Sequence, residues 1–411
     1  MKPFLLILLL ACLAFPQVQN PDYREIKNNK FVLNKITYIP LNEGMRYLHS
    51  CWGGIGYAKE GFVYVMVCDH ATNAAGFEYQ TKTDKLYYMG DIRTQLALTR
   101  HADRQPKIHT PLIQYGKNGL VYFGTDAGDR SLDVFDHADE GYRGGVLVSL
   151  NPITKEFKDL GLFLPHAGWK CLAVDQDHGY IYANLSAPSA YFTKYDIANN
   201  RFDMLGRVHE FEAPRILFLD KWNNVYNTAT TGDLVRYNVE KDKLEYLNVK
   251  MMPGAAAGPG QIAYGPDRDW VIGIDGYTGT IMKYTPARDG PGRVDSVANI
   301  FGGVRKYMRN LNMAGNKLYM VVADREASET KEIKEDKKKR AKPTLYIFNL
   351  DTRAVEKKIP MDDRVQMGFS HGVADADGNL YVVGFLDTPD MARPGKVKDR
   401  VFLIKFNPKD L

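Results

Sequence analysis

The sequence predicts an all-β fold, a seven-bladed β-propeller that forms a single domain over residues 20–411. Three observations predict it: a short motif that recurs seven times, a second motif that follows each copy, and the shortage of helical patterns in a chain with 25 Tyr and 36 Gly. Tyr is favoured in half-exposed strands, and Gly is favoured in tight turns. Repeats spaced by roughly 40 to 50 residues are typical of propellers.

The first motif is a turn residue, any residue, an aliphatic or aromatic residue, and then Tyr. Its copies are Gly61–Tyr64, Gly119–Tyr122, Gly179–Tyr182, Asn223–Tyr226, Asn316–Tyr319 and Gly378–Tyr381, and a seventh copy, Asp269–Ile272, replaces the Tyr. An apolar run precedes each copy, as in Cys171–Asp175 and Ile216–Asp220. This order indicates a strand, a tight turn and a second strand.

The second motif, an aromatic residue or Leu followed by a polar turn-former, predicts the end of a third strand. Its copies are Tyr79-Gln80, Leu150-Asn151, Tyr195-Asp196, Tyr237-Asn238, Tyr284-Thr285, Phe348-Asn349 and Phe406-Asn407. A fourth strand usually follows, such as Phe157–Gly161. The last repeat ends at Phe406-Asn407-Pro408 without residues for a fourth strand, so we expect Phe31–Thr37 to supply it and to close the ring.

The loops predict which face of the ring is the working face. In a propeller, the segment that enters the innermost strand and the loop between the second and third strands open on one face, here called the upper face. The hairpins between the first and second strands open on the lower face. Three second-to-third loops are long, at residues 125–146, 323–343 and 386–400. Within the second of these, residues 331–342 carry seven Lys or Arg and three Asp or Glu. This segment is either a solvated excursion or a basic lip that attracts a polyanion.

The N-terminus predicts an exported protein. A charged start and the apolar run Phe4–Phe15 are typical of a secretory signal, cut near Ala14 or a few residues later, and residues 1–19 are assigned to it. The run is too short to span a bilayer, and we expect no transmembrane segment. We therefore expect a secreted or periplasmic protein. The stretch Leu9–Cys12 also resembles a lipobox, which leaves a lipid-anchored surface protein as the alternative.

Charge and cysteine content exclude several classes. The chain has 54 Lys and Arg against 49 Asp and Glu, a net charge too small to indicate a nucleic-acid partner. Beyond the signal it carries Cys51, Cys68 and Cys171, too few for a disulfide scaffold. We expect Cys51 and Cys68 to lie nearly opposite each other as packed thiols. No cysteine spacing indicates a metal site. We expect a monomer without an organic cofactor, and a structural metal ion is left open.

The histidines are distributed unevenly between the two predicted faces. Eight of the nine fall on the upper face: His49, His70, His101, His109, His137, His166, His209 and His371. His178 belongs to the lower face.

Six other residues also lie at the starts of innermost strands, namely Trp169, Lys170, Arg215, Gln261, Arg309 and Asn310. Trp can stack on a sugar ring and Arg can bind a carboxylate or sulfate in a bidentate way. As substrate-binding residues we select Arg215, Trp169, His166, His209 and His371, each of which has an ordinary rim contact as its alternative.

Common catalytic motifs are missing from the sequence. There is no Ser nucleophile elbow, Walker loop, dinucleotide fingerprint or His-Glu-x-x-His zinc motif. The Asp and Glu residues show no pairing that marks a glycosidase.

Four stretches are similar to a known family. They are Gly90-Asp91-Ile92-Arg93, Pro106-Lys107-Ile108-His109-Thr110-Pro111-Leu112, Gly119–Thr125 and Tyr142-Arg143-Gly144-Gly145. The chain resembles the seven-bladed propeller polysaccharide lyases of the ulvan lyase type and their secreted relatives over most of its first four blades. The segment 107–111 is the most specific part. The resemblance implies β-elimination at a 4-linked uronic acid in a sulfated algal polysaccharide.

The resemblance also implies roles for individual residues. His109 matches the family's His within Lys-Ile-His-Thr-Pro, whereas Tyr191 and Arg207 match a Tyr and Arg pair by spacing and by lying on the upper face. Arg215 is the alternative to Arg207, and either His209 or His166 supplies a second histidine.

The sequence departs from the family pattern at two positions. Asp126 follows Thr125 where relatives place a His, and Ala187 precedes Pro188 where relatives carry Tyr.

The leading hypothesis is therefore a lyase that acts on an acidic, uronate-containing polysaccharide. His109 would be the general base, alone or with a second His, and Tyr191 would be the acid, or both acid and base. Arg207 or Arg215 would neutralise the carboxylate. A second hypothesis is a non-catalytic propeller that binds an acidic glycan or a protein partner. A third is a hydrolase that uses carboxylates such as Asp126 and Asp275.

Overall fold

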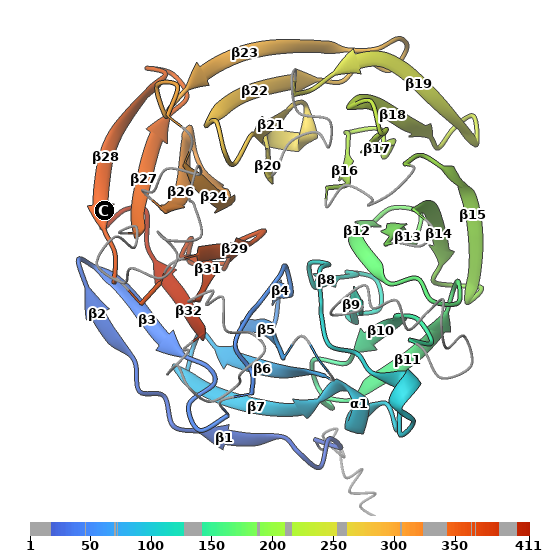
Figure 1. Cartoon of the computed structure of the whole chain (residues 1–411), viewed down its shortest axis with the longest axis vertical. Coiled ribbons are helices and arrows are strands. Elements are labelled where there is room, and N and C mark those ends of the chain that lie inside the picture. Colours follow the sequence, from blue (N-terminus) through green and yellow to red (C-terminus); the bar gives the residue numbers. More distant parts are fainter. Residues whose placement is uncertain are drawn as a thin grey trace, which may run out of the picture.

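Each predicted repeat folds into one antiparallel sheet, and seven sheets surround a common axis (Figure 1). The computed structural model describes residues 18–45, 47–69, 71, 73–126, 142–186, 190–209, 216–252, 261–304, 306–323, 343–362, 364–365, 367–385 and 401–411, and all structural statements concern these residues. The predicted all-β, seven-bladed propeller is confirmed.

The first four blades follow one another along the chain. Blade 1 contains, from the axis outward, β4 (Ile55–Ala58), β5 (Phe62–Cys68), β6 (Ala74–Gln80), β7 (Lys85–Asp91) and β1 (Arg24–Ile26), and α1 (Ile92–Gln95) follows it. Blade 2 contains β8 (Ile113–Gln114), β9 (Val121–Gly124), β10 (Val146–Leu150) and β11 (Phe157–Leu162). Blade 3 contains β12 (Trp169–Asp175), β13 (Tyr180–Leu185), β14 (Tyr191–Asp196) and β15 (Arg201–Arg207). Blade 4 contains β16 (Phe218–Leu219), β17 (Val225–Thr228), β18 (Asp233–Asn238) and β19 (Lys243–Lys250).

The remaining three blades complete the ring. Blade 5 contains β20 (Gln261–Tyr264), β21 (Val271–Ile274), β22 (Thr280–Thr285) and β23 (Arg293–Asn299). Blade 6 contains β24 (Tyr307–Asn310), β25 (Asn312–Ala314), β26 (Lys317–Ala323), β27 (Pro343–Asn349) and β28 (Ala354–Pro360). Blade 7 contains β29 (Met367–Ser370), β30 (Val373–Ala374), β31 (Leu380–Phe385), β32 (Val401–Phe406), β3 (Ile36–Pro40) and β2 (Phe31–Leu33). A short parallel pairing of β24 with β29 joins blades 6 and 7.

The N-terminal segment closes the ring, as predicted, but it does so with two strands. β3 pairs with β32 and β2 pairs with β3, so the segment 31–37 is split between the two strands. The cause is a two-residue turn at Asn34 and Lys35, where φ is 51° and 64°. Such left-handed pairs form the tight hairpins that match strand twist. Blade 1 also gains an outer strand, β1, that the sequence did not predict.

The repeated Tyr has a structural role. All six copies are buried, with exposed fractions of 0 to 3%: Tyr64, Tyr122, Tyr182, Tyr226, Tyr319 and Tyr381. Two of them, Tyr226 and Tyr381, donate their hydroxyls at 2.8 Å to an oxygen of Asp220 and of Asp375 respectively. The other oxygen of each Asp accepts backbone N–H groups of the lower-face turn. The second strand is thereby tied to the turn that starts it.

This role predicts different effects for chemically identical substitutions. Tyr226→Phe and Tyr381→Phe are each expected to lower the free energy of unfolding by about 1.5–3 kcal/mol, the usual contribution of a hydrogen bond to a charged group. The matched control is Tyr182→Phe, because the Tyr182 hydroxyl has no hydrogen-bond partner among the described residues. Chemical denaturation of the three variants measures the difference. Equal destabilisation by all three would contradict the role of the hydroxyl.

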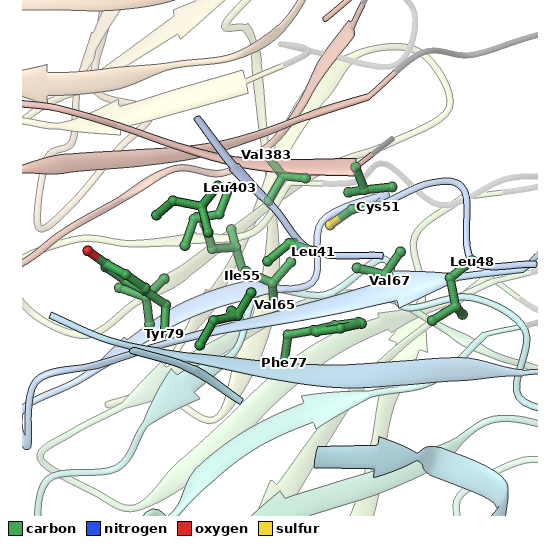
Figure 2. Packing of buried hydrophobic residues seen from close by; sticks show 14 of the residues in the cluster. Leu41, Leu48, Cys51, Ile55, Val65, Val67, Phe77, Tyr79, Val383 and Leu403 are labelled. Carbon is green, nitrogen blue, oxygen red and sulfur yellow. The ribbon is translucent and has the colours of Figure 1, made fainter. Parts of the chain in front are cut away.

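The core consists of apolar clusters between neighbouring blades. Figure 2 shows the cluster at the point of ring closure, where Val65 and Phe77 of blade 1 face Val383 and Leu403 of blade 7. Side chains from both faces of each sheet are therefore buried against the adjacent blades. This packing joins the first and last parts of the chain independently of the β3 and β32 pairing.

A buried ion pair fastens blade 1 to blade 2. Lys155 Nζ lies 2.6 Å from Glu78 Oε2, and their side chains are only 5% and 0% exposed. Tyr23 donates its hydroxyl to Glu78 Oε1 at 2.7 Å. Asn20 donates its amide to the carbonyl oxygens of Met89 and Lys155. We call Glu78, Lys155, Tyr23 and Asn20 the blade 1–2 clasp, through which the segment that precedes β1 holds two blades together.

Cys51, Cys68 and Cys171 are buried free thiols, and burial raises the pKa of both Cys51 and Cys171 to about 12. No helix in the described part of the chain is long and apolar enough to cross a membrane. The predicted signal segment lies outside the described residues, except at its last two positions.

Candidate functional site

The predicted general base, His109, makes a buried contact with a carboxylate. His109 lies in the segment that leads into β8, and Asp126 lies just after β9. Backbone hydrogen bonds between Lys107 and Asp126 hold these two segments side by side. His109 Nδ1 is 2.5 Å from Asp126 Oδ2, and each side chain is 4% exposed. The carboxylate accepts a hydrogen bond from Nδ1–H. In the neutral ring the lone pair is therefore on Nε2.

Blade 3 completes the surroundings of Asp126. Ser186, which follows β13, donates its hydroxyl to Asp126 Oδ1 at 2.8 Å. The backbone N–H of Gly168 donates to the Ser186 oxygen at 3.0 Å. A side chain at Gly168 cannot be accommodated, because its Cβ would lie 1.9 Å from Asp126 Oδ1. The His109–Asp126 pair therefore lies at the junction of blades 2 and 3 on the upper face.

The surroundings keep Asp126 ionised. Burial is the largest effect and opposes ionisation, but His109, Lys170 and the Ser186 hydroxyl outweigh it, so that the pKa of Asp126 is lowered to about 2. A carboxyl group whose pKa falls on folding stabilises the protein above its unfolded pKa, roughly 3.9. This contribution is lost as the pH falls through the lowered value.

An indole and a cation lie beside the pair. The Trp52 ring is edge-on to the His109 ring, with 6.5 Å between centroids. Lys107 Nζ lies 5.3 Å from the centroid of the Trp52 ring. Both side chains are half-buried. Sequence reasoning did not select them as site residues, although Lys107 belongs to the most specific stretch of the family resemblance.

Further cationic side chains surround the upper edge of blade 2. Arg100 contacts Asp103 through Nε and one terminal nitrogen, both at 3.0 Å. Arg143 lies 3.5 Å from the same carboxylate, so two guanidinium groups share one negative charge. Arg104 contacts the ring of His101 at 3.3 Å. Among the described residues, three guanidinium groups and the one carboxylate of Asp103 meet here, and we call these residues the positive edge of blade 2. Such an arrangement favours an anionic ligand.

Tyr191 and Arg207, the predicted acid and charge-neutralising group, are brought together in blade 3. They are directly opposite each other on β14 and β15. Arg207 is exposed, and its Nε donates to the carbonyl oxygen of His209 at 3.3 Å. These three residues lie on the outer half of blade 3, whereas His109 precedes the innermost strand of blade 2. Ser186, which contacts Asp126, belongs to the same blade as Tyr191 and Arg207.

The predicted ligand-binding residues have different positions. Trp169 is 1% exposed, packs against Phe202 and donates its ring N–H to the carbonyl oxygen of Gly145, so its indole is part of the core between blades 2 and 3 rather than an open stacking surface. His166 is half-buried, and its Nδ1 lies 2.7 Å from the carbonyl oxygen of Tyr142. His371 borders the central channel of the ring.

Several predicted features lie outside the described residues. They are Arg215, His70, His137, Ala187, the segment 331–342 and most of the three long loops, and the same holds for the side chain of Arg309.

The two alternative carboxylates, Asp126 and Asp275, belong to different blades. Asp275 lies in the turn between β21 and β22 of blade 5, where its Oδ1 accepts the backbone N–H of Tyr277 at 2.8 Å. Asp126 belongs to blade 2. In the part of the chain that the structure covers, no group of three His, Cys, Asp or Glu side chains could hold a metal ion.

Fold and site define the protein as a seven-bladed β-propeller with a buried His–Asp pair on its upper face. No protein-family model and no curated protein matches the chain. Among solved structures it is similar to a chain in the mitotic checkpoint complex, with 10% identity, a TM-score of 0.55, and coverage of 95% of this chain and 93% of that one. It is also similar to a chain in a nidogen/laminin complex, with 12% identity, a TM-score of 0.43, and coverage of 72% and 92%. At this identity the first likeness shows a shared fold alone.

Proposed function

We propose that the protein is an exported polysaccharide lyase that cleaves an acidic, uronate-containing polysaccharide by β-elimination on its upper face. The observation that supports this proposal best is the His109–Asp126 pair. A carboxylate on Nδ1 fixes the tautomer of an imidazole and compensates the charge that the ring gains when Nε2 accepts a proton. The positive edge of blade 2 suits the charge of the substrate.

The reaction assigns a role to each group. His109 Nε2 removes the proton from C5 of the uronate, and the electrons of the C5–H bond form a C4=C5 double bond. The C4–O4 bond breaks, and Tyr191 protonates the departing O4. A cation must neutralise the uronate carboxylate so that the C5 proton becomes acidic. Arg207, opposite Tyr191, is the candidate on blade 3, and Arg215 remains the alternative.

A second function follows from the low exposure of the same pair. His109 and Asp126 are each 4% exposed, and together with Ser186 of blade 3, which donates to Asp126, such a pair also serves to join blades 2 and 3. On this basis the protein would be a non-catalytic propeller that binds an acidic glycan or a protein partner with the positive edge of blade 2.

One experiment separates these functions. The protein is incubated with ulvan and with other polyuronates, and the ultraviolet absorbance of the unsaturated uronate is followed. The lyase proposal predicts a steady rise on at least one polymer. Polymer binding without any rise would establish the non-catalytic alternative, and new reducing ends without this absorbance would indicate a hydrolase.

A further inference from the structure

The axis of the ring contains a cavity that the proposed reaction does not use. Its volume is about 640 Å³, and innermost segments of all seven blades line it. Most of its wall is aliphatic, including Leu172, Val174, Leu217, Ile262 and Val373. An apolar wall cannot replace the hydrogen bonds that a polar molecule loses on leaving water. The shaft of this central channel therefore favours an aliphatic ligand.

The lower mouth of the channel differs from its shaft. Arg268 lies there, in the turn that joins β20 to β21, beside the half-exposed ring of Tyr264. Its neighbour Asp269 pairs with Lys221. Among the described residues, no carboxylate lies within ion-pair distance of the Arg268 guanidinium. A cation at the end of an apolar shaft is complementary to a molecule with an anionic head and an aliphatic tail.

The height of the channel sets the length of such a tail. The lining residues of blade 3 run from Leu172 to Gln176, a rise of roughly 13 Å at about 3.3 Å per residue. An extended chain of about ten carbon atoms has this length. His371 and Asn312 also line the channel, and they add polar atoms to its wall. The wall of the channel is thus mostly apolar, and the cation of Arg268 lies at its lower end.

We propose that the central channel binds a medium-chain fatty acid, with its carboxylate at Arg268 and its tail along the shaft. This site is independent of the proposed lyase reaction, because Arg268 lies on the lower face and His109 on the upper face.

Calorimetric titration tests the proposal with decanoate as the probe, below its micelle concentration. We expect saturable binding of one decanoate per protein, weaker binding of decanol, which lacks the charge, and no binding of acetate, which lacks the tail. Arg268→Met keeps the apolar stem and removes the charge, and it should weaken decanoate binding by about 10-fold or more. Arg201→Met, at an exposed arginine of β15, is the matched control and should leave binding unchanged.

A second variant tests the position of the tail. Ile262→Phe enlarges a half-buried side chain that lines the channel, and it should weaken decanoate binding while the far-ultraviolet circular dichroism stays unchanged. His109→Ala should bind decanoate normally, whatever its effect on polysaccharide. Absence of saturable decanoate binding, or equal affinity of wild type and Arg268→Met, would overturn the proposal.

Discussion

Replacing His109 by Ala is expected to reduce kcat/KM for β-elimination by about 10²–10⁴-fold, the usual contribution of a positioned acid–base group. Asp126→Asn should have an effect of similar size, because an amide on Nδ1 no longer favours the tautomer with a free lone pair on Nε2. Initial rates on the best polyuronate substrate measure both effects.

A second His–Asp pair provides the control. His178 Nδ1 lies 2.7 Å from Asp175 Oδ2 in the lower-face turn of blade 3. His178→Ala therefore removes the same kind of contact, but on the face away from the proposed site, and should leave kcat/KM unchanged. Full activity in a folded His109→Ala variant would show that another residue removes the proton.

Replacing Lys155 by Met is expected to lower the free energy of unfolding by about 3–5 kcal/mol, because Glu78 would be left buried without a cation. Burial is the main effect on Lys155 and lowers its pKa, although Glu78 acts in the opposite direction. The measurement is chemical denaturation at neutral pH. Replacing both residues of the pair by apolar ones should recover much of the loss, since no buried charge remains.

An exposed ion pair within blade 1 is the matched control. Lys85 Nζ lies 2.8 Å from Glu25 Oε2, with side chains 47% and 51% exposed. Lys85→Met should change stability little, because water solvates both charges before and after the substitution. If Lys155→Met were as mild as Lys85→Met, the blade 1–2 clasp would not depend on its ion pair.

The fold was predictable because its repeats carry a physical constraint. Six of the seven second strands carry a buried Tyr at the same position, and Tyr226 and Tyr381 also bind the turn Asp six residues earlier, so residue type and spacing recur together. The strand β1 was not predictable, since its three residues show no alternation of apolar and polar side chains. The turn at Asn34 and Lys35 depends on two left-handed residues that are not glycine.

The site was predictable only in part. The family resemblance identified His109, but Asp126 entered as a departure from the family pattern, and only the paired segments around β8 and β9 show that it contacts His109. Trp169 begins an innermost strand, as expected. Its burial could not be foreseen, because both faces of a blade are covered by neighbouring blades and periodicity does not reveal which side chains remain open.

Closure of the ring by β3 and β32 has a consequence for biosynthesis. The strand that completes blade 7 is translated near the start of the chain, and its partner is translated at the end. Until the ribosome has released β32, β3 has an unpaired edge, and the apolar residues of blade 1 that face blade 7 stay uncovered. The nascent chain therefore depends on protection from aggregation until translation is complete.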